Sequence, residues 1–203
     1  MEIIKKIMKR ILIFFINLLI LPISLIIPKS NKIVIIGGWF GKRFADNSKY
    51  LYLYLNDNLN NLGFNKVIWI TRNKKIKNEL NKQGYRAYCT WSILSIWYHF
   101  RAKYHFIDQS VEDINGFFSI RSKRINMWHG FPLKKIGNYM KYKNRSISIL
   151  ENIMRKWTTR GFWYDQYILA TSNLSAEVLG KAFGIDKSKV IISGYPRNYD
   201  TVY

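Results

Sequence analysis

The stretch at residues 167–198, YILATSNLSAEVLGKAFGIDKSKVIISGYPRN, decides the expected fold of this chain. Its hydrophobic pattern predicts a strand, a helix and a second, buried strand, at residues 167–171, 174–183 and 190–193. Ser172 or Asn173 is expected to cap the helix, and Gly184 to end it. Because two parallel strands need a crossover connection, which a helix supplies, this unit predicts a parallel α/β sheet.

The same alternation continues toward the amino end. Further strands are expected at residues 32–36, 66–71, 85–88, 104–107 and 125–128. Helices are expected from a cap at Asp46 or Asn47 to a stop at Gly63, over residues 74–83, from Thr90, and over residues 149–159. The longest expected loop covers residues 112–123. Residues 31–203 are therefore predicted to form one Rossmann-like domain, a doubly wound parallel sheet.

Composition sets limits on the function. The chain has 203 residues with 33 Lys and Arg against 12 Asp and Glu, a formal net charge of +21. This excess predicts polyanionic surroundings, such as an anionic membrane surface or phosphate-bearing substrates. The single cysteine, Cys89, excludes an internal disulfide framework and a multi-cysteine metal site, and we expect neither a metal nor a cofactor. Nucleic acid is not an expected partner, because no recognisable binding signature accompanies the charge.

Residues 1–30 are expected to associate with a membrane. Residues 3–10 form an amphipathic pattern with a basic face, and residues 11–27 are almost wholly apolar, with Pro22 inside the run. A helix that stops before this proline would be only about 16 Å long, against about 30 Å of hydrocarbon. Basic flanks favour an in-plane anchor on the cytoplasmic face, with a spanning helix or a helix in the protein's own core as alternatives. A cleaved signal peptide is disfavoured, since no small-residue cleavage site follows.

Ligands of such sheets bind beyond the carboxyl ends of the strands, and the segments that follow the strands are therefore candidates. The first is GGWFGKRFADN, residues 37–47, a glycine-rich turn with Lys42 and Arg43 before a helix. Its backbone N–H groups and cations predict an anion or acceptor contact, with a plain tight turn as the alternative. It lacks the G-x-G-x-x-G pattern of dinucleotide sites.

The second candidate is WHGFPLKK, residues 128–135. An imidazole at a strand end, His129, is able to take a proton near neutral pH, and Gly130 leaves room for a substrate. Lys134 and Lys135 are candidate phosphate ligands. The alternative is a structural loop histidine, which is also how we interpret His99 and His105, set among aromatic residues.

The third candidate is SGYPRN, residues 193–198, where Gly194 ends a strand and Arg197 presents a guanidinium. Arg197 is predicted to contact a phosphate through two N–H groups. A simple turn is the alternative, since glycine and proline also form turns.

These segments together resemble a known family. WHGFPLKKIG, the strand–helix–strand unit at residues 167–198 and FGKRFADNSKYLYLYL near the start are similar to the CDP-glycerol glycerophosphotransferases of teichoic acid synthesis, and the resemblance covers residues 32–200. It implies two Rossmann-like domains facing a cleft, as in glycosyltransferases of the B type. It also implies a peripheral enzyme on the cytoplasmic face of the cell membrane, which moves glycerol phosphate from CDP-glycerol to a lipid-linked acceptor and releases CMP.

The resemblance assigns roles to particular residues. His129 matches the family's general base on the acceptor hydroxyl, while Lys134 and Arg197 match residues expected to stabilise phosphate charge. Phe131 stands where the family more often has threonine, and Tyr199 interrupts the usual Asn-Asp pair.

The resemblance further implies that the nucleotide-binding carboxyl domain is missing here, so the chain is expected to be an amino-terminal half. A second half-protein or another copy of the chain is then an expected partner. The alternative function is a non-catalytic membrane-bound module that binds anionic lipid or polymer. Primase or polymerase activity, and glycerol or ribitol phosphate as the transferred unit, stay open.

Overall fold

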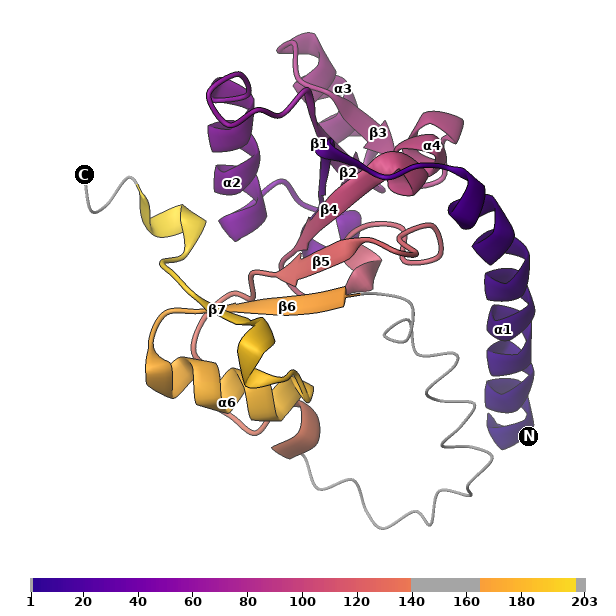
Figure 1. Ribbon diagram of the computed structural model, residues 1–203, viewed down its shortest axis with the longest axis vertical. Helices are drawn as coiled ribbons and strands as arrows, with labels where there is room; N and C mark the ends of the chain where they lie inside the picture. The colour runs from indigo at the N-terminus through magenta and orange to yellow at the C-terminus, as the bar shows by residue number, and fades with distance from the viewer. Residues whose placement is uncertain (1, 140–164, 200–203) are drawn as a thin grey trace.

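The computed structural model describes residues 2–139 and 165–199. Its centre is one seven-stranded, wholly parallel sheet in the order β3-β2-β1-β4-β5-β6-β7 (Figure 1). The strands are β1 (Ser30–Ile36), β2 (Lys66–Thr71), β3 (Ala87–Cys89), β4 (Ala102–Ile107), β5 (Lys123–Asn126), β6 (Asp165–Ala170) and β7 (Val190–Ile192). The predicted α/β class is confirmed. The helix expected at residues 149–159 lies outside the described residues.

Helices cover both faces of the sheet. They are α1 (Glu2–Ile26), α2 (Asp46–Asp57), α3 (Lys74–Lys82), α4 (Ile93–Arg101) and α6 (Asn173–Phe183). Short 3-10 turns are η1 (Trp39–Gly41), η2 (Val111–Asp113), η3 (Gly137–Tyr139), η4 (Lys187–Lys189) and η5 (Pro196–Asn198). Helices α2 and α3 bury one set of alternate strand residues, and α4 and α6 lie over the other set. The sheet is thus doubly wound, as predicted.

The face under α2 carries an aromatic cluster. Trp69 of β2 is fully buried, and its ring meets Phe44 and Tyr52 edge-to-face at centroid distances of 4.7 and 5.6 Å. Such pairs add about 0.5–1.5 kcal/mol each beyond the burial of their area. Because Phe44 directly precedes α2 and Tyr52 lies within it, this cluster fixes where the helix begins.

The cap of α2 differs from the prediction. Asp46 or Asn47 was expected to cap the helix, but Ala45 holds the N-cap position and makes no side-chain cap hydrogen bond. The two polar residues lie inside the first turn instead. Their side chains are consequently available for contacts with other loops.

The carboxyl-terminal unit follows the prediction in its caps and departs from it in burial. Ser172 caps α6, and Gly184 ends it in the left-handed conformation with φ 65°. The predicted burial of the last strand is wrong, because Ile191 and Ile192 are 41% and 53% exposed. Strand β7 is the last strand of the described sheet, with β6 on one side; Val190 packs against the residues under α6, but Ile191 and Ile192 lack cover.

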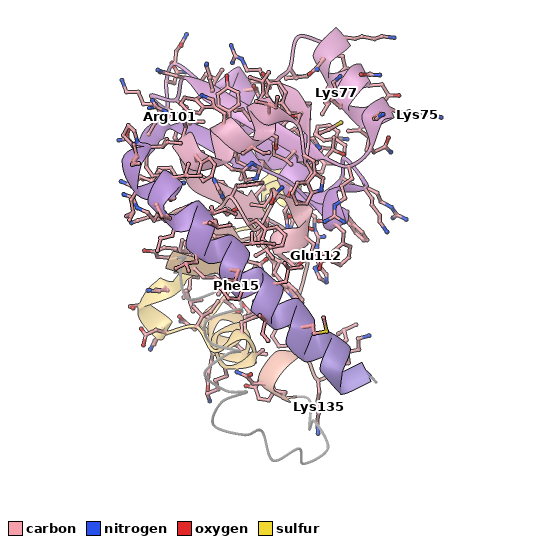
Figure 2. The ribbon with its side chains drawn as sticks, turned by 90° about the vertical axis from the view of Figure 1, so that its right-hand side faces the viewer. Phe15, Lys75, Lys77, Arg101, Glu112 and Lys135 are labelled. Carbon is pink, nitrogen blue, oxygen red and sulfur yellow. The ribbon has the colours of Figure 1, made fainter. Side chains whose placement is uncertain are left out.

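Helix α1 is longer than expected. It does not stop before Pro22 but continues through this residue to Ile26. In Figure 1 α1 stands on the opposite side of the domain from α2, and in Figure 2 it crosses the front of the molecule with Phe15 near its middle. One side of its carboxyl half packs through Ile20 against Phe100 and Ile120. Arg121 also donates a hydrogen bond to the carbonyl of Ser24.

The other side of α1 is apolar and exposed. Its exposed apolar face consists of Met8, Ile11, Leu12, Phe15, Leu18, Leu19, Ile23, Leu25 and Ile26. Within the part of the chain that the structure describes, no helix is both long and apolar enough to cross a bilayer. The expected membrane-associating segment is therefore a helix that rests partly on the domain, and its contact with a membrane stays a prediction.

The structural interpretation of two histidines, one on α4 and one on β4, is confirmed. His99 and His105 are fully buried with ring centroids 5.4 Å apart. Nδ1 of His99 donates to the carbonyl of Ser95 at 2.6 Å, and Nε2 accepts from the backbone N–H of Asn115 at 3.1 Å. Burial lowers the pKa of His99 to about 4 and lowers that of His105 as well.

These pKa values predict a pH-dependent stability. Since the folded pKa of His99 lies below the unfolded value, its contribution is present above pH 6.5 and is lost as the pH falls toward 4. We expect His99→Gln to lower the free energy of unfolding at pH 7. The difference in this free energy between wild type and variant should become smaller by roughly 2–3 kcal/mol by pH 4. Urea unfolding at pH 7, 6, 5 and 4 measures this. Leu174→Gln, at an exposed position of α6, is the control, and a gap for His99→Gln that is independent of pH would contradict the prediction.

Candidate active site at the carboxyl edge of the sheet

The strand order places the candidate site. The chain runs β3-β2-β1 in one direction from the centre and β4-β5-β6-β7 in the other, so the order reverses between β1 and β4. Ligands of open α/β sheets bind at the carboxyl edge near such a reversal. The segments that follow β1, β4, β5 and β7 all begin at this edge, and hydrogen bonds between them define a single site.

His129 lies in the loop after β5. Trp128 before it and Gly130 after it have positive φ angles, 56° and 148°. The indole of Trp128 packs against the ring of Phe183 in α6 and against the imidazole of His129, with centroid distances of 4.8 and 4.1 Å. The imidazole is half-buried, and its Nδ1 is buried without a hydrogen-bond partner among the described residues. His129 thus sits at the rim of the sheet, where the sequence analysis expects it.

Arg197 of η5 joins the same place. Its Nη2 donates to the carbonyl of His129 at 3.0 Å, and its Nη1 forms an ion pair with Oδ1 of Asp46 at 2.6 Å. The side chains are 34% and 11% exposed, so water screens the pair less than it screens a surface ion pair. The guanidinium therefore already has a carboxylate partner, and its predicted phosphate contact stays a prediction.

Asn47 forms hydrogen bonds with the loop after β5 and with the segment after β7. Its amide Nδ2 donates to the carbonyl of Trp128 at 2.7 Å, and its Oδ1 accepts the backbone N–H of Arg197 at 3.3 Å. The residue is fully buried. Sequence reasoning named Asp46 and Asn47 only as helix caps, since both residue types are also preferred caps.

Asp108 is a further residue that the sequence analysis missed. It follows β4 directly, and its carboxyl accepts the backbone N–H of Ser48 in α2 at 3.1 Å. Asp113 lies behind it and accepts the N–H groups of Asp108, at 2.9 Å, and of Phe40, at 2.6 Å. Burial raises the pKa of Asp108 to about 8 and also raises that of Asp113. The sequence signal that could have identified Asp108 is an acidic residue directly after a predicted central strand.

The turn after β1 has to be glycine because of the close approach of these two aspartates. A Cβ atom on Gly38 would lie 2.7 Å from Oδ2 of Asp108, and one on Gly37 would lie 2.3 Å from the carbonyl oxygen of Asp113. The glycines therefore let the β1 turn approach the buried acids closely.

The remaining predicted residues lie farther out. Gly130 has the φ angle noted above, and a Cβ there would meet Nη2 of Arg197 at 3.9 Å. Lys42, Arg43, Lys134 and Lys135 are exposed, and Figure 2 shows Lys135 near the lower end of the molecule. Within residues 2–139 and 165–199, no hydrogen bond or ion pair joins these four cations to His129 or Arg197. The structure thus brings together His129, Gly130 and Arg197 but leaves the other cations apart from them.

A cavity of about 860 Å³ lies beside the site, between α2 and the segment after β7. Its polar and aromatic lining includes Lys49, Tyr50, Tyr54, Asp57, Tyr195 and Tyr199. Gly194 also lines it, and a Cβ on this glycine would meet nothing within 4 Å, so the predicted Gly194 faces open space. In the described part of the chain, no group of three or more His, Cys, Asp or Glu side chains is placed to hold a metal ion.

Fold and site define a class: a doubly wound α/β domain with an imidazole, a guanidinium and buried carboxyls at the reversal of its strand order. The comparison with protein families is more specific. Residues 19–203 match the family described as CDP-Glycerol:Poly(glycerophosphate) glycerophosphotransferase, and the chain belongs to this family.

Curated relatives agree with this assignment. The chain is 27% identical over 177 residues to the teichoic acid poly(glycerol phosphate) polymerase of Bacillus spizizenii, covering 85% of this chain and 43% of that protein. It is 28% identical over 177 residues to the teichoic acid glycerol-phosphate transferase of Staphylococcus aureus, covering 85% and 42%. The chain therefore spans less than half the length of these relatives.

Solved structures support the fold. The structure of the wall teichoic acid polymerase TagF superimposes with a TM-score of 0.61 at 22% identity, covering 86% of this chain and 41% of that one. A TagF variant soaked with CDPG gives a TM-score of 0.56 at 21% identity, covering 84% and 41%. At this identity, the similarity establishes the fold.

The buried Asp108 carboxyl predicts a second pH dependence. Because its folded pKa is raised to about 8, the folded state keeps a proton that the unfolded chain loses, and wild-type stability falls as the pH rises from 4 to 8. We expect the advantage of Asp108→Asn over wild type to grow across this range, by up to about 1.4 kcal/mol per pH unit. Chemical unfolding at pH 5, 6, 7 and 8 measures it. Asp57→Asn, at an exposed position of α2, is the matched control, and parallel curves for wild type and Asp108→Asn would refute the assignment.

Proposed function

We propose that this chain takes part in the transfer of glycerol phosphate from CDP-glycerol to a hydroxyl of a lipid-linked acceptor in teichoic acid synthesis. The observation that carries the proposal is the position of His129. It lies at the reversal of the strand order with Arg197 on its carbonyl, in a chain that belongs to the glycerophosphotransferase family.

The reaction assigns a role to each group. The imidazole of His129 takes the proton of the acceptor hydroxyl, and the oxygen forms a bond to the glycerol-bearing phosphorus of CDP-glycerol. The bond from this phosphorus to the CMP oxygen breaks, and CMP leaves. Arg197, Lys134 and Lys135 stabilise the phosphate charge, and Lys42 and Arg43 attract the anionic acceptor.

The donor site requires more than the described residues supply. The relatives are more than twice as long as the matched region, and we infer that the expected nucleotide-binding domain lies in their remaining length. We propose that such a domain completes the CDP-glycerol site. It would be supplied within a longer polypeptide, by a second half-protein, or by an association of copies.

Helix α1 supports a position at the cytoplasmic face of the cell membrane. Its exposed apolar face, defined above, is combined with basic residues in its first turns and a formal net charge of +21. Apolar burial and attraction to anionic lipid both favour an in-plane helix. The same features also favour the second candidate function, a non-catalytic module that binds anionic lipid or polymer.

Transfer activity separates the two candidates. We expect the chain, supplied with CDP-glycerol, a lipid-linked acceptor and the carboxyl half of a relative, to release CMP. His129→Ala should reduce the rate at least about 100-fold, the usual contribution of a general base. Lys75→Ala, which removes an exposed cation of α3 far from Lys135, is the control (Figure 2). Full activity of His129→Ala would show that the base is assigned wrongly, and no CMP from wild type would leave only the binding module.

Membrane contact is tested separately, with vesicles of phosphatidylglycerol and of phosphatidylcholine. Leu12 and Leu19 are 60% and 73% exposed, and inserting a leucine side chain into lipid is worth about 1.5–3 kcal/mol. The double variant Leu12→Gln, Leu19→Gln should therefore sediment with phosphatidylglycerol vesicles at least about tenfold more weakly than wild type. Leu174→Gln, equally apolar and 65% exposed on α6, should bind as wild type does. Equal binding of all variants would remove α1 from the membrane contact.

A further inference from the structure

The first turn of α2 contacts both loops that carry the candidate catalytic groups. Asn47 donates to Trp128 O at 2.7 Å and accepts from the backbone of Arg197 at 3.3 Å, and Asp46 pairs with the Arg197 guanidinium at 2.6 Å. These bonds span 81, 150 and 151 residues of sequence. Neither residue holds the N-cap position, and although Oδ1 of Asp46 also accepts the adjacent backbone N–H of Asn47 at 3.0 Å, these three contacts reach beyond the helix.

The contacts fix the backbone on both sides of the His129 Cα atom. Asn47 holds the carbonyl before it, that of Trp128, and Arg197 holds the carbonyl of His129 itself at 3.0 Å. These two peptide planes set the direction of the His129 Cα–Cβ bond, from which the imidazole projects. Asp46 in turn holds the guanidinium that makes the second contact.

The loop needs such contacts because its backbone is unfavourable. Trp128 in this loop has a φ of 56°, rare for a bulky residue, and Asp46 at the start of α2 also has a positive φ, 60°. Such conformations cost of order 1–3 kcal/mol and persist where the surroundings over-determine them. The buried Asn47 amide supplies a donor and an acceptor at the required place, and Phe44 and Tyr52 fix the helix that carries it.

We propose that Asn47 and Asp46 are positioning residues of the transfer reaction. Asn47 sets the direction of the His129 imidazole, and Asp46 holds Arg197 against the His129 carbonyl. The role in transfer rests on the proposed function, whereas the effect on the imidazole is measurable without any reaction.

Acylation by diethyl pyrocarbonate, followed by mass spectrometry, measures the imidazole directly. The chain has three histidines, and His99 and His105 are fully buried, so they report unfolding while half-buried His129 reports its loop. We expect Asn47→Ala to raise the rate of His129 acylation at least about threefold, with His99 and His105 still protected. Asn47→Asp, which keeps the acceptor and loses the donor to Trp128, should behave in the same way.

The matched control is Asn56→Ala, nine residues further along α2, which removes an amide that donates to Tyr52 O within the helix. It should acylate at the wild-type rate. Asn47→Ala cannot be used if it unfolds, which reaction of all three histidines would show. In that case Asp46→Asn, which keeps the side-chain shape and removes the ion pair, tests the proposal, and it should also raise the rate of His129 acylation at least about threefold. Unchanged His129 acylation in a folded variant overturns the proposal.

Kinetics of the complemented enzyme test the catalytic consequence. Asn47→Ala should lower kcat at least about tenfold, with KM for CDP-glycerol within about twofold of wild type, because the base is misplaced while donor binding is intact. A changed KM with unchanged kcat would contradict a positioning role. If even wild type transfers nothing, the proposed function fails, while the acylation result still decides whether Asn47 and Asp46 set the imidazole.

Discussion

The ion pair between Asp46 and Arg197 closes the site, because it joins the first turn of α2 to the segment after β7 across 151 residues of sequence. Its geometry depends on the sheet, which brings the ends of β1, β5 and β7 to one edge. It also depends on the aromatic cluster around Trp69, which fixes α2. A low exposed fraction limits screening by water and salt, so the pair holds the loops more firmly than a surface pair would.

Local signals explain which parts of the fold were predictable. Strand β2 has the predicted bounds, residues 66–71, and Ser172 and Gly184 begin and end α6 as expected, because periodicity and caps act over a few residues. The exposure of β7 depends on its place at the end of the described sheet, which no local pattern encodes. The continuation of α1 through Pro22 likewise depends on packing, since Ile20 just before this residue is held by Phe100 and Ile120.

In the candidate site, the residues that follow strands were predictable from the sequence, whereas the long-range side-chain contacts were not. His129 and Arg197 follow strands, and a parallel sheet sends all such segments to one edge, so their meeting could be expected from order alone. The role of Asn47 could not, because an asparagine before a helix is explained equally well by capping, and the contact with Trp128 lies 81 residues away. Lys134 and Lys135 follow the same strand as His129 yet are exposed, as are Phe131 and Leu133 between them and Gly130.

Charge divides the site into two zones. A chain with only 12 acidic residues places Asp46, Asp108 and Asp113 together at the inner floor of this edge, while the exposed cations lie outside it. These carboxyl groups would repel a phosphate group if all three were charged and unpaired. Burial raises the pKa of Asp108 to about 8, which favours its neutral form at pH 7, and Asp46 is paired with the Arg197 guanidinium. Both effects reduce the negative charge of the floor, so the surrounding lysines and arginines contribute most of the potential that an anionic substrate meets.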